Sequence, residues 1–80
     1  MNLEIINPEQ KVYSGKVKSV IVPGAKGSFG ILRNHAPIIS TLEKGKVKII
    51  EDNGAEKFFD IERGIIEVNR NKIILIAESL

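Results

Sequence analysis

Short stretches in which apolar and polar residues alternate occur along most of the chain. Residues 3–5 and 45–49 show the alternation most clearly, and it is typical of a strand with one buried and one solvated face. Turn signals recur every ~8–12 residues, the spacing of a sandwich or barrel. No window of useful length has the three-to-four spacing of an amphipathic helix. The pattern predicts an all-β fold of about eight to ten short strands.

Two of the expected strands depart from simple alternation. After a short strand at residues 12–15 that ends in a bend, residues 16–22 form a longer one, in which polarity switches sides midway. Residues 73–77 are apolar on both sides. A strand of that kind is buried on both faces or covered by something outside the domain.

The strongest hairpin signal is the pair Asn53-Gly54. Asn-Gly suits the two positive-φ positions of a type I′ turn. We therefore expect the arms, roughly residues 47–51 and 55–61, to pair antiparallel around a two-residue turn.

Residues 22–37 form the most distinctive segment, which we interpret as a loop, a short strand at residues 28–32 and a second loop. Gly24, Gly27 and Gly30 recur at a spacing of three. We expect Gly30 to need a positive φ or a close backbone approach, so that valine there would disturb the loop. The segment is suited to presenting a rigid surface to a partner.

Length and charge place limits on the class of protein. The 80 residues form one domain, 1–80, without cysteine. The net charge is only +2, and both signs are interspersed, which argues against a nucleic-acid-binding protein. No apolar run approaches the ~20 residues of a membrane span, and no signal peptide is recognisable at the start. We expect any membrane association to be indirect, through a partner.

The motifs of common enzymes are missing. The glycine spacing fits neither a Walker phosphate loop nor a dinucleotide-binding fingerprint. One histidine without cysteine does not provide the usual zinc ligands, and there is no Gly-x-Ser-x-Gly elbow. We therefore expect no catalytic residue, no cofactor and no metal in this chain.

Two residues of the central segment have alternative interpretations. His35 either fixes its own turn by bonding a backbone carbonyl or contacts a partner on an exposed edge. Phe29 is either a core anchor or an exposed contact.

Five lysines could form a basic ladder if their strands are neighbours: Lys16, Lys18, Lys44, Lys46 and Lys48. The ordinary interpretation is a solvated face whose lysines discourage edge pairing. The alternative is a small nucleic-acid-binding barrel, which needs exposed aromatic rings among the lysines. None of Tyr13, Phe29, Phe58 and Phe59 is expected to lie there.

The chain closely resembles the epsilon subunit of the bacterial rotary ATP synthase, specifically its N-terminal β-sandwich domain. The opening motif is Asn-Pro-Glu-Gln followed by Tyr-Ser-Gly, at residues 7–15. The most specific signature is Val-Pro-Gly-x-x-Gly-x-Phe-Gly-Ile-Leu-x-Asn-His-Ala-Pro, at residues 22–37. Residues 45–49 and 64–68 fit the middle and final strands of the family, so that the resemblance covers essentially the whole chain.

The resemblance implies a two-sheet antiparallel β-sandwich and a mechanical function. The chain would be a non-catalytic subunit of the central stalk, packed on the gamma subunit and seated on the polar loops of the c-subunit ring. It would couple proton flow to ATP synthesis, with the catalytic sites on other subunits. Its location would be peripheral, on the cytoplasmic face of the bacterial inner membrane.

The resemblance also assigns contact residues by position. Those of the loop that faces the c ring would be Lys26, Gly27, Ser28, Phe29 and Gly30, with Arg33 and His35 near by. Those facing the gamma subunit would be Asn7, Pro37, Ile39 and Ser40.

The sequence departs from typical family members at its end. Those members continue for about fifty more residues into a C-terminal helical hairpin, a length equal to that of the smallest domains. We expect a natural short form, to which hairpin-based inhibition and nucleotide binding do not apply. The alternatives to the rotor subunit are the nucleic-acid-binding barrel and a generic β-sandwich adaptor.

Overall fold

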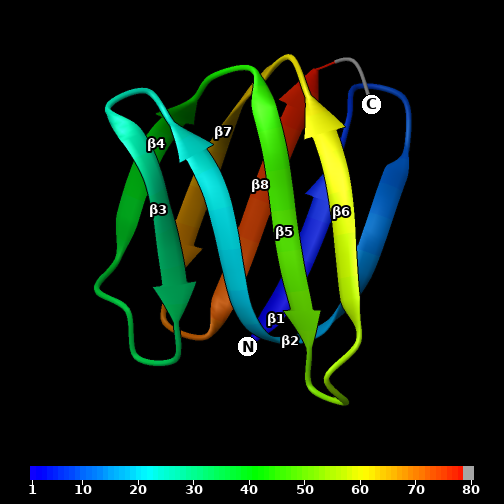
Figure 1. Ribbon diagram of the computed structural model, residues 1–80, viewed down its shortest axis with the longest axis vertical. Helices are drawn as coiled ribbons and strands as arrows, with labels where there is room; N and C mark the ends of the chain where they lie inside the picture. Colours follow the sequence, from blue (N-terminus) through cyan, green and yellow to red (C-terminus); the bar gives the residue numbers. More distant parts are fainter. Residues whose placement is uncertain (79–80) are drawn as a thin grey trace.

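The computed structural model describes residues 1–78 and contains eight strands. They are β1 (Asn2–Ile6), β2 (Lys11–Gly24), β3 (Gly27–Leu32), β4 (Ile38–Leu42), β5 (Gly45–Glu51), β6 (Glu56–Ile61), β7 (Arg63–Asn69) and β8 (Lys72–Glu78). The all-β prediction is confirmed (Figure 1). Within the described residues, no helix is long and apolar enough to cross a bilayer.

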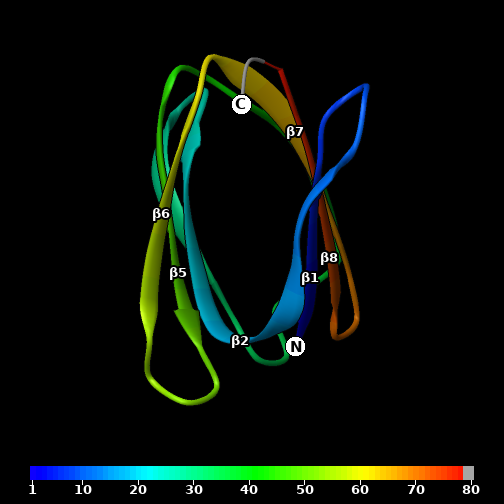
Figure 2. The same cartoon turned by 90° about the vertical axis from the view of Figure 1, so that its right-hand side faces the viewer.

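The strands form two layers that share one long strand. In the first layer β4, β7, β8 and β1 lie side by side and continue into the N-terminal half of β2. In the second layer the C-terminal half of β2 lies between β3 and β5, and β6 forms the edge beyond β5. Figure 2 shows the layers edge-on, with β2 passing from one to the other at the bottom.

The change of layer occurs at an irregularity in β2. Val17 is in register with Glu51 of β5, whereas Ser19 is in register with Ile50, so Lys18 is an extra residue in the ladder. An extra residue of this kind bends a strand and increases its twist. It also reverses which side chains point inward, because Val17 and then Val20 are buried. The switch of polarity expected within residues 16–22 is this irregularity.

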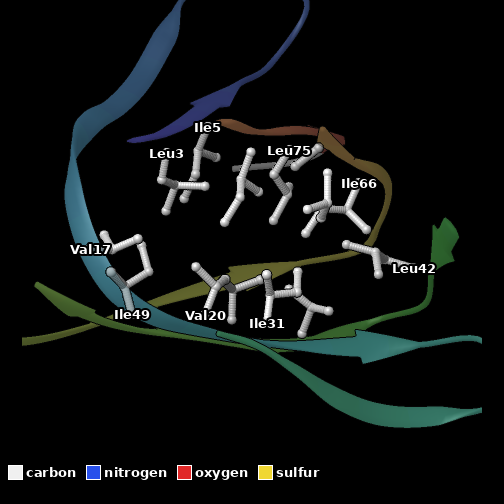
Figure 3. Packing of buried hydrophobic residues seen from close by; sticks show 14 of the residues in the cluster. Leu3, Ile5, Val17, Val20, Ile31, Leu42, Ile49, Ile66 and Leu75 are labelled. Carbon is white, nitrogen blue, oxygen red and sulfur yellow. The ribbon is translucent and has the colours of Figure 1, made fainter. Parts of the chain in front are cut away.

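The core is the apolar space between the layers (Figure 3). Fifteen hydrophobic residues from all eight strands are buried in it, and no polar or charged residue of the described chain is buried. Branched aliphatic side chains dominate the core, which explains why so small a domain closes without a disulfide. Ile73, Leu75 and Ala77 are the inward-facing residues of the strand that is apolar on both sides.

Two details of the prediction are wrong. Residues 12–15 and 16–22 are not separate strands, because β2 continues through Gly15 without a break. The β5–β6 hairpin exists, but its loop has four residues and only Gly54 has a positive φ (91°), so the turn is not type I′. The antiparallel arrangement also has one exception, because β1 and β8 are parallel.

Candidate functional site

The described residues contain no group of three or more histidine, cysteine, aspartate or glutamate side chains that could hold a metal ion. Figure 1 shows two ends of the sandwich, which we call the upper and lower ends. The β2–β3 turn lies at the upper end, and the N-terminus, the β3–β4 loop and the β5–β6 loop lie at the lower end.

The hairpin of β2 and β3 contains the first group of expected contact residues. Two residues, Ala25 and Lys26, connect the strands, and Gly27 follows with a φ of 120°. Ser28 is exposed, whereas Phe29 packs against the core. The core-anchor interpretation of Phe29 is thus confirmed. We call residues 24–29 the hairpin tip.

The glycines of this hairpin have unequal importance. A Cβ atom on Gly24 would lie 2.7 Å from the Gly27 carbonyl oxygen and from the Phe29 ring. A Cβ atom on Gly30 would have no neighbour nearer than 3.9 Å, and Gly30 has no positive φ. The expectation for Gly30 is therefore wrong, and the close approach occurs at Gly24.

Arg33 and His35 are not near the hairpin tip. They follow β3, so the whole strand separates them from Lys26, a distance of about 20 Å at ~3.4 Å per residue. The His35 ring contacts the Ala36 carbonyl oxygen at 2.7 Å through Nδ1. Since a carbonyl only accepts, Nδ1 carries the proton, and His35 fixes its own turn as the first interpretation proposed.

The residues expected to face the gamma subunit are also divided. Asn7 lies in the β1–β2 turn, where its side-chain oxygen accepts hydrogen bonds from the amides of residues 9 and 10. Ile39 on β4 points outward and is 73% exposed. Ser40 points the other way, toward the hairpin tip, with which it lines a shallow groove of about 470 Å³. Pro37 lies at the lower end, in the loop before β4.

The outer surface of the first layer carries a group of isoleucines, together with Glu67 and the ion pairs Lys11–Glu4 and Arg63–Glu78. Ile65 on β7 is in register with Thr41 on β4 and with Ile76 on β8, and Ile76 is in register with Ile6 on β1. Ile65 and Ile76 are 46% and 47% exposed. We call Ile6, Ile39, Ile65, Ile74 and Ile76 the apolar face. The sequence signal for it was the strand at residues 73–77, but residues 65 and 76 were not singled out as contacts.

The outer surface of the second layer is charged. Lys46 pairs with Asp60 at 3.0 Å, Lys48 with Glu56 at 3.5 Å, and Lys44 with Glu62 at 3.9 Å. Three of the five lysines of the expected basic ladder are therefore paired with carboxylates from β6 and the residue after it, whereas Lys16 and Lys18 are not. One expectation is wrong here, because Lys46 lies over the Phe58 ring, 5.9 Å from its centroid. We call this surface the ion-pair face.

Tyr13 closes one open side between the layers. Its hydroxyl donates a hydrogen bond of 2.5 Å to the Glu51 carboxylate, and its ring meets the Phe59 ring edge-on. Burial, together with the Glu51 contact, raises the pKa of Tyr13 to about 12. The hydrogen bond from Tyr13 lowers the pKa of Glu51. The pair forms a contact between the two layers.

The comparisons with known proteins agree with this geometry. The family model described as "ATP synthase, Delta/Epsilon chain, beta-sandwich domain" matches residues 1–80. The chain belongs to this family of ATP synthase delta/epsilon-chain β-sandwich domains. It is 42% identical over 78 residues to an ATP synthase epsilon chain of Chlorobium limicola, covering 98% of this chain and 89% of that protein.

Other relatives of this ATP synthase family differ in length. An epsilon chain of Alkalilimnicola ehrlichii is 35% identical over 79 residues; 99% of this chain is covered, but this chain spans only 56% of that protein. A solved structure of the Euglena gracilis mitochondrial ATP synthase contains a chain that matches with a TM-score of 0.85 at 16% identity. The match covers 94% of this chain and 48% of that one, and shows that the two share the fold.

Proposed function

We propose that this chain is a non-catalytic central-stalk subunit of a proton-translocating ATP synthase. It links the gamma subunit to the c-subunit ring and couples proton flow to ATP synthesis, while catalysis occurs on other subunits. It is peripheral to the cytoplasmic face of the bacterial inner membrane and reaches the membrane only through its partners. Membership of the delta/epsilon-chain family supports this assignment. The main structural observation in its favour is the apolar face, which indicates a protein partner.

The apolar face fits a protein partner better than water. Ile65, Ile76 and Ile6 are in register on three adjacent strands, and Ile39 and Ile74 lie on either side of Glu67 on the same surface. Within residues 1–78, this surface carries two ion pairs, and the opposite surface carries three. Burying a fully exposed isoleucine contributes about 1.5–3 kcal/mol, so half-exposed residues still provide a substantial driving force together. We assign the apolar face, with Asn7 and Pro37 at its margins, to the gamma subunit.

The hairpin tip fits the other partner. Lys26, Gly27 and Ser28 are exposed at a tight turn that packing of Phe29 on Gly24 holds in place. A turn fixed in this manner transmits force with little local deformation. We assign the hairpin tip, together with Ser40 beside it, to the polar loops of the c ring. Arg33 and His35 are left out of this assignment because they lie at the opposite end of β3.

Copurification from bacterial membranes tests the proposal. A tagged chain, expressed in cells that contain the complex, is expected to bring down the gamma and c subunits. Ile76→Glu is expected to lose the gamma subunit, because it places a charge in the apolar face. Ile21→Glu is the matched control, since Ile21 is 40% exposed on the outer surface of the other layer. If the wild-type chain brings down neither subunit, the proposal is wrong.

A further inference from the structure

The basic side chains of this protein that form no ion pair within the described residues are unevenly distributed over the molecule. Six of the twelve lie within 4 Å of a carboxylate: Lys11, Lys44, Lys46, Lys48, Lys57 and Arg63. The other six have no carboxylate of residues 1–78 within that distance: Lys16, Lys18, Lys26, Arg33, Arg70 and Lys72. All of these except Lys26 lie at the lower end of the sandwich. We call these five the basic end.

The topology brings the basic end together from distant parts of the sequence. Asn2 on β1 is in register with Lys16 on β2 and with Lys72 on β8, so the two lysines flank it. The Asn2 amide also donates a 2.7 Å hydrogen bond to the Asn71 carbonyl, which places the turn containing Arg70 beside them. Figure 1 shows the N-terminus and the β7–β8 turn at this end.

A small hollow continues the basic end under the second layer. Lys18 and Arg33 line it together with Met1 and Asp52, around a volume of about 230 Å³. Asp52 is the one carboxylate of the described residues that lines this hollow. The nearby carboxylate of Glu51 accepts the Tyr13 hydroxyl and pairs with Lys57 at 3.5 Å. Glu51 is therefore already engaged.

The clustering of unpaired cations at the basic end does not stabilise the folded chain. Like charges brought together destabilise the compact state by repulsion. The same fold pairs its other cations with carboxylates across neighbouring strands, so pairing was available as an arrangement. Unpaired cations at one end of the molecule therefore suit an anionic partner, whose approach they also accelerate.

Apolar groups beside the basic end indicate what kind of anion fits. Leu32, directly before Arg33, is 62% exposed, and Ile39 beyond the loop is 73% exposed. A shallow groove of about 420 Å³ ends next to Arg70; its lining is mostly apolar but includes Glu67 and Asn69. Among the described residues, no aromatic ring lines either hollow, whereas single-stranded nucleic acids bind by stacking on such rings.

We infer that the basic end is a docking surface for an acidic, partly apolar polypeptide segment of a neighbouring protein. Its carboxylates pair with the ammonium group of Lys18 and with Arg33 and Arg70. The planar guanidinium group of each arginine can donate two parallel hydrogen bonds to a carboxylate. Its apolar side chains cover Leu32, which lies outside the apolar face. The inference concerns the chemistry of the segment and does not depend on the rotor assignment.

Titration of the 80-residue chain with acidic polypeptides tests the inference. Poly-L-glutamate is the probe, with oligothymidylate and phosphatidylserine vesicles as competing anions, and amide chemical shifts report the site. We expect poly-L-glutamate to shift the amides around Lys18, Arg33 and Arg70 and not that of Lys26. A peptide of mixed glutamate and leucine is expected to bind more tightly than poly-L-glutamate. Leu32→Asn is expected to reduce this additional affinity and to leave the binding of poly-L-glutamate unchanged.

Paired charge reversals provide the matched control. Lys18→Glu with Arg33→Glu is expected to weaken poly-L-glutamate binding by roughly tenfold or more, because two close charge pairs are lost. Lys26→Glu with Lys44→Glu changes the net charge equally but lies at the upper end, and is expected to weaken binding by less than about threefold through screened long-range effects. Thermal unfolding confirms that both remain folded. Equal losses, no binding by the wild type, or tighter binding to oligothymidylate or vesicles would overturn the inference.

Discussion

At the scale of single residues, Tyr13 has the most specific contact in the molecule. It lies in the N-terminal half of β2, and its hydroxyl reaches Glu51 at the end of β5, 38 residues away. Lys57 approaches both, pairing with Glu51 and lying over the Tyr13 ring at 5.4 Å. Sequence pattern identified Tyr13 only as part of a strand, because the contact depends on how the two layers face each other.

The titration of Tyr13 is predictable because it is the only tyrosine in the chain. We expect its ultraviolet absorbance to report ionisation with a midpoint of about 12. Glu51→Gln is expected to move the midpoint only part of the way back toward 10, since burial, the larger cause, remains. Glu56→Gln serves as the control, because Glu56 pairs with Lys48 instead. A wild-type midpoint near 10 would contradict the cross-layer contact.

The same contact gives stability a pH dependence at both extremes. The folded-state pKa of Tyr13 is raised, so its contribution is complete below pH 10 and is lost as the pH rises toward 12. The folded-state pKa of Glu51 is lowered, so its contribution is present above the ordinary value of 4.5 and is lost as the pH falls below it. Urea unfolding at several pH values is expected to show both losses, and Tyr13→Phe is expected to flatten them.

Gly24 and Gly30 provide a second test at the residue scale. Gly24→Ala is expected to lower the free energy of unfolding by about 1–3 kcal/mol, because the new methyl group meets backbone and the Phe29 ring. Gly30→Ala is expected to be neutral or to stabilise by up to about 1 kcal/mol, because its site is open and glycine weakens a strand. Chemical denaturation measures both, and equal effects would show that the close approach at Gly24 is unimportant.

At the scale of the secondary-structure elements, β2 determines the architecture. Its fourteen residues belong to both layers, and the extra residue Lys18 marks the crossing. The consequence for the side chains is visible in the sequence as a change of the buried side between Val17 and Val20. The sheet pairing on either side depends on that single residue.

Deletion of Lys18 tests the role of this irregularity. Removing the extra residue forces one half of β2 to turn its valines outward, because a shift of one residue exchanges the faces of a strand. We expect the free energy of unfolding to fall by at least about 3 kcal/mol, the contribution of two buried valines. Deletion of Asn53 in the β5–β6 loop is the control and is expected to cost about 1 kcal/mol, since three-residue hairpin loops are common. Similar losses in both would mean that the irregularity has no special role.

The elements were predictable where the signal was local. Alternation located the strands, and Asn53-Gly54 located the β5–β6 hairpin. The predicted type I′ turn was wrong, because the loop has four residues and only Gly54 has a positive φ. The parallel pairing of β1 with β8 joins strands from opposite ends of the chain, with Ile6 in register with Ile76, and no local pattern reports it. The strand at residues 28–32 was also predicted, but Arg33 was still placed near Lys26, although a strand of that length puts its two ends far apart.

At the scale of the whole molecule, the two outer surfaces are chemically different. The apolar face suits a permanent protein partner. The ion-pair face surrounds the exposed Ile21 and Phe58 with lysine–carboxylate pairs, and exposed ion pairs contribute little to stability and tolerate solvent. The family resemblance anticipated partners, but it placed the gamma contacts at Asn7, Pro37, Ile39 and Ser40. The sheet register was needed to show that Ile39 belongs to a surface with Ile65 and Ile76.

Cross-linking from single cysteines tests the rotor assignment most directly, because the natural sequence contains no cysteine to compete. A photoreactive group is attached to Ile76→Cys, Ser28→Cys or Phe58→Cys within the assembled ATP synthase. We expect Ile76→Cys to cross-link to the gamma subunit, Ser28→Cys to the c subunit, and Phe58→Cys on the ion-pair face to neither. The assignment is contradicted if the chain is present in the complex while Ile76→Cys and Ser28→Cys reach neither subunit, or if Phe58→Cys reaches the gamma subunit.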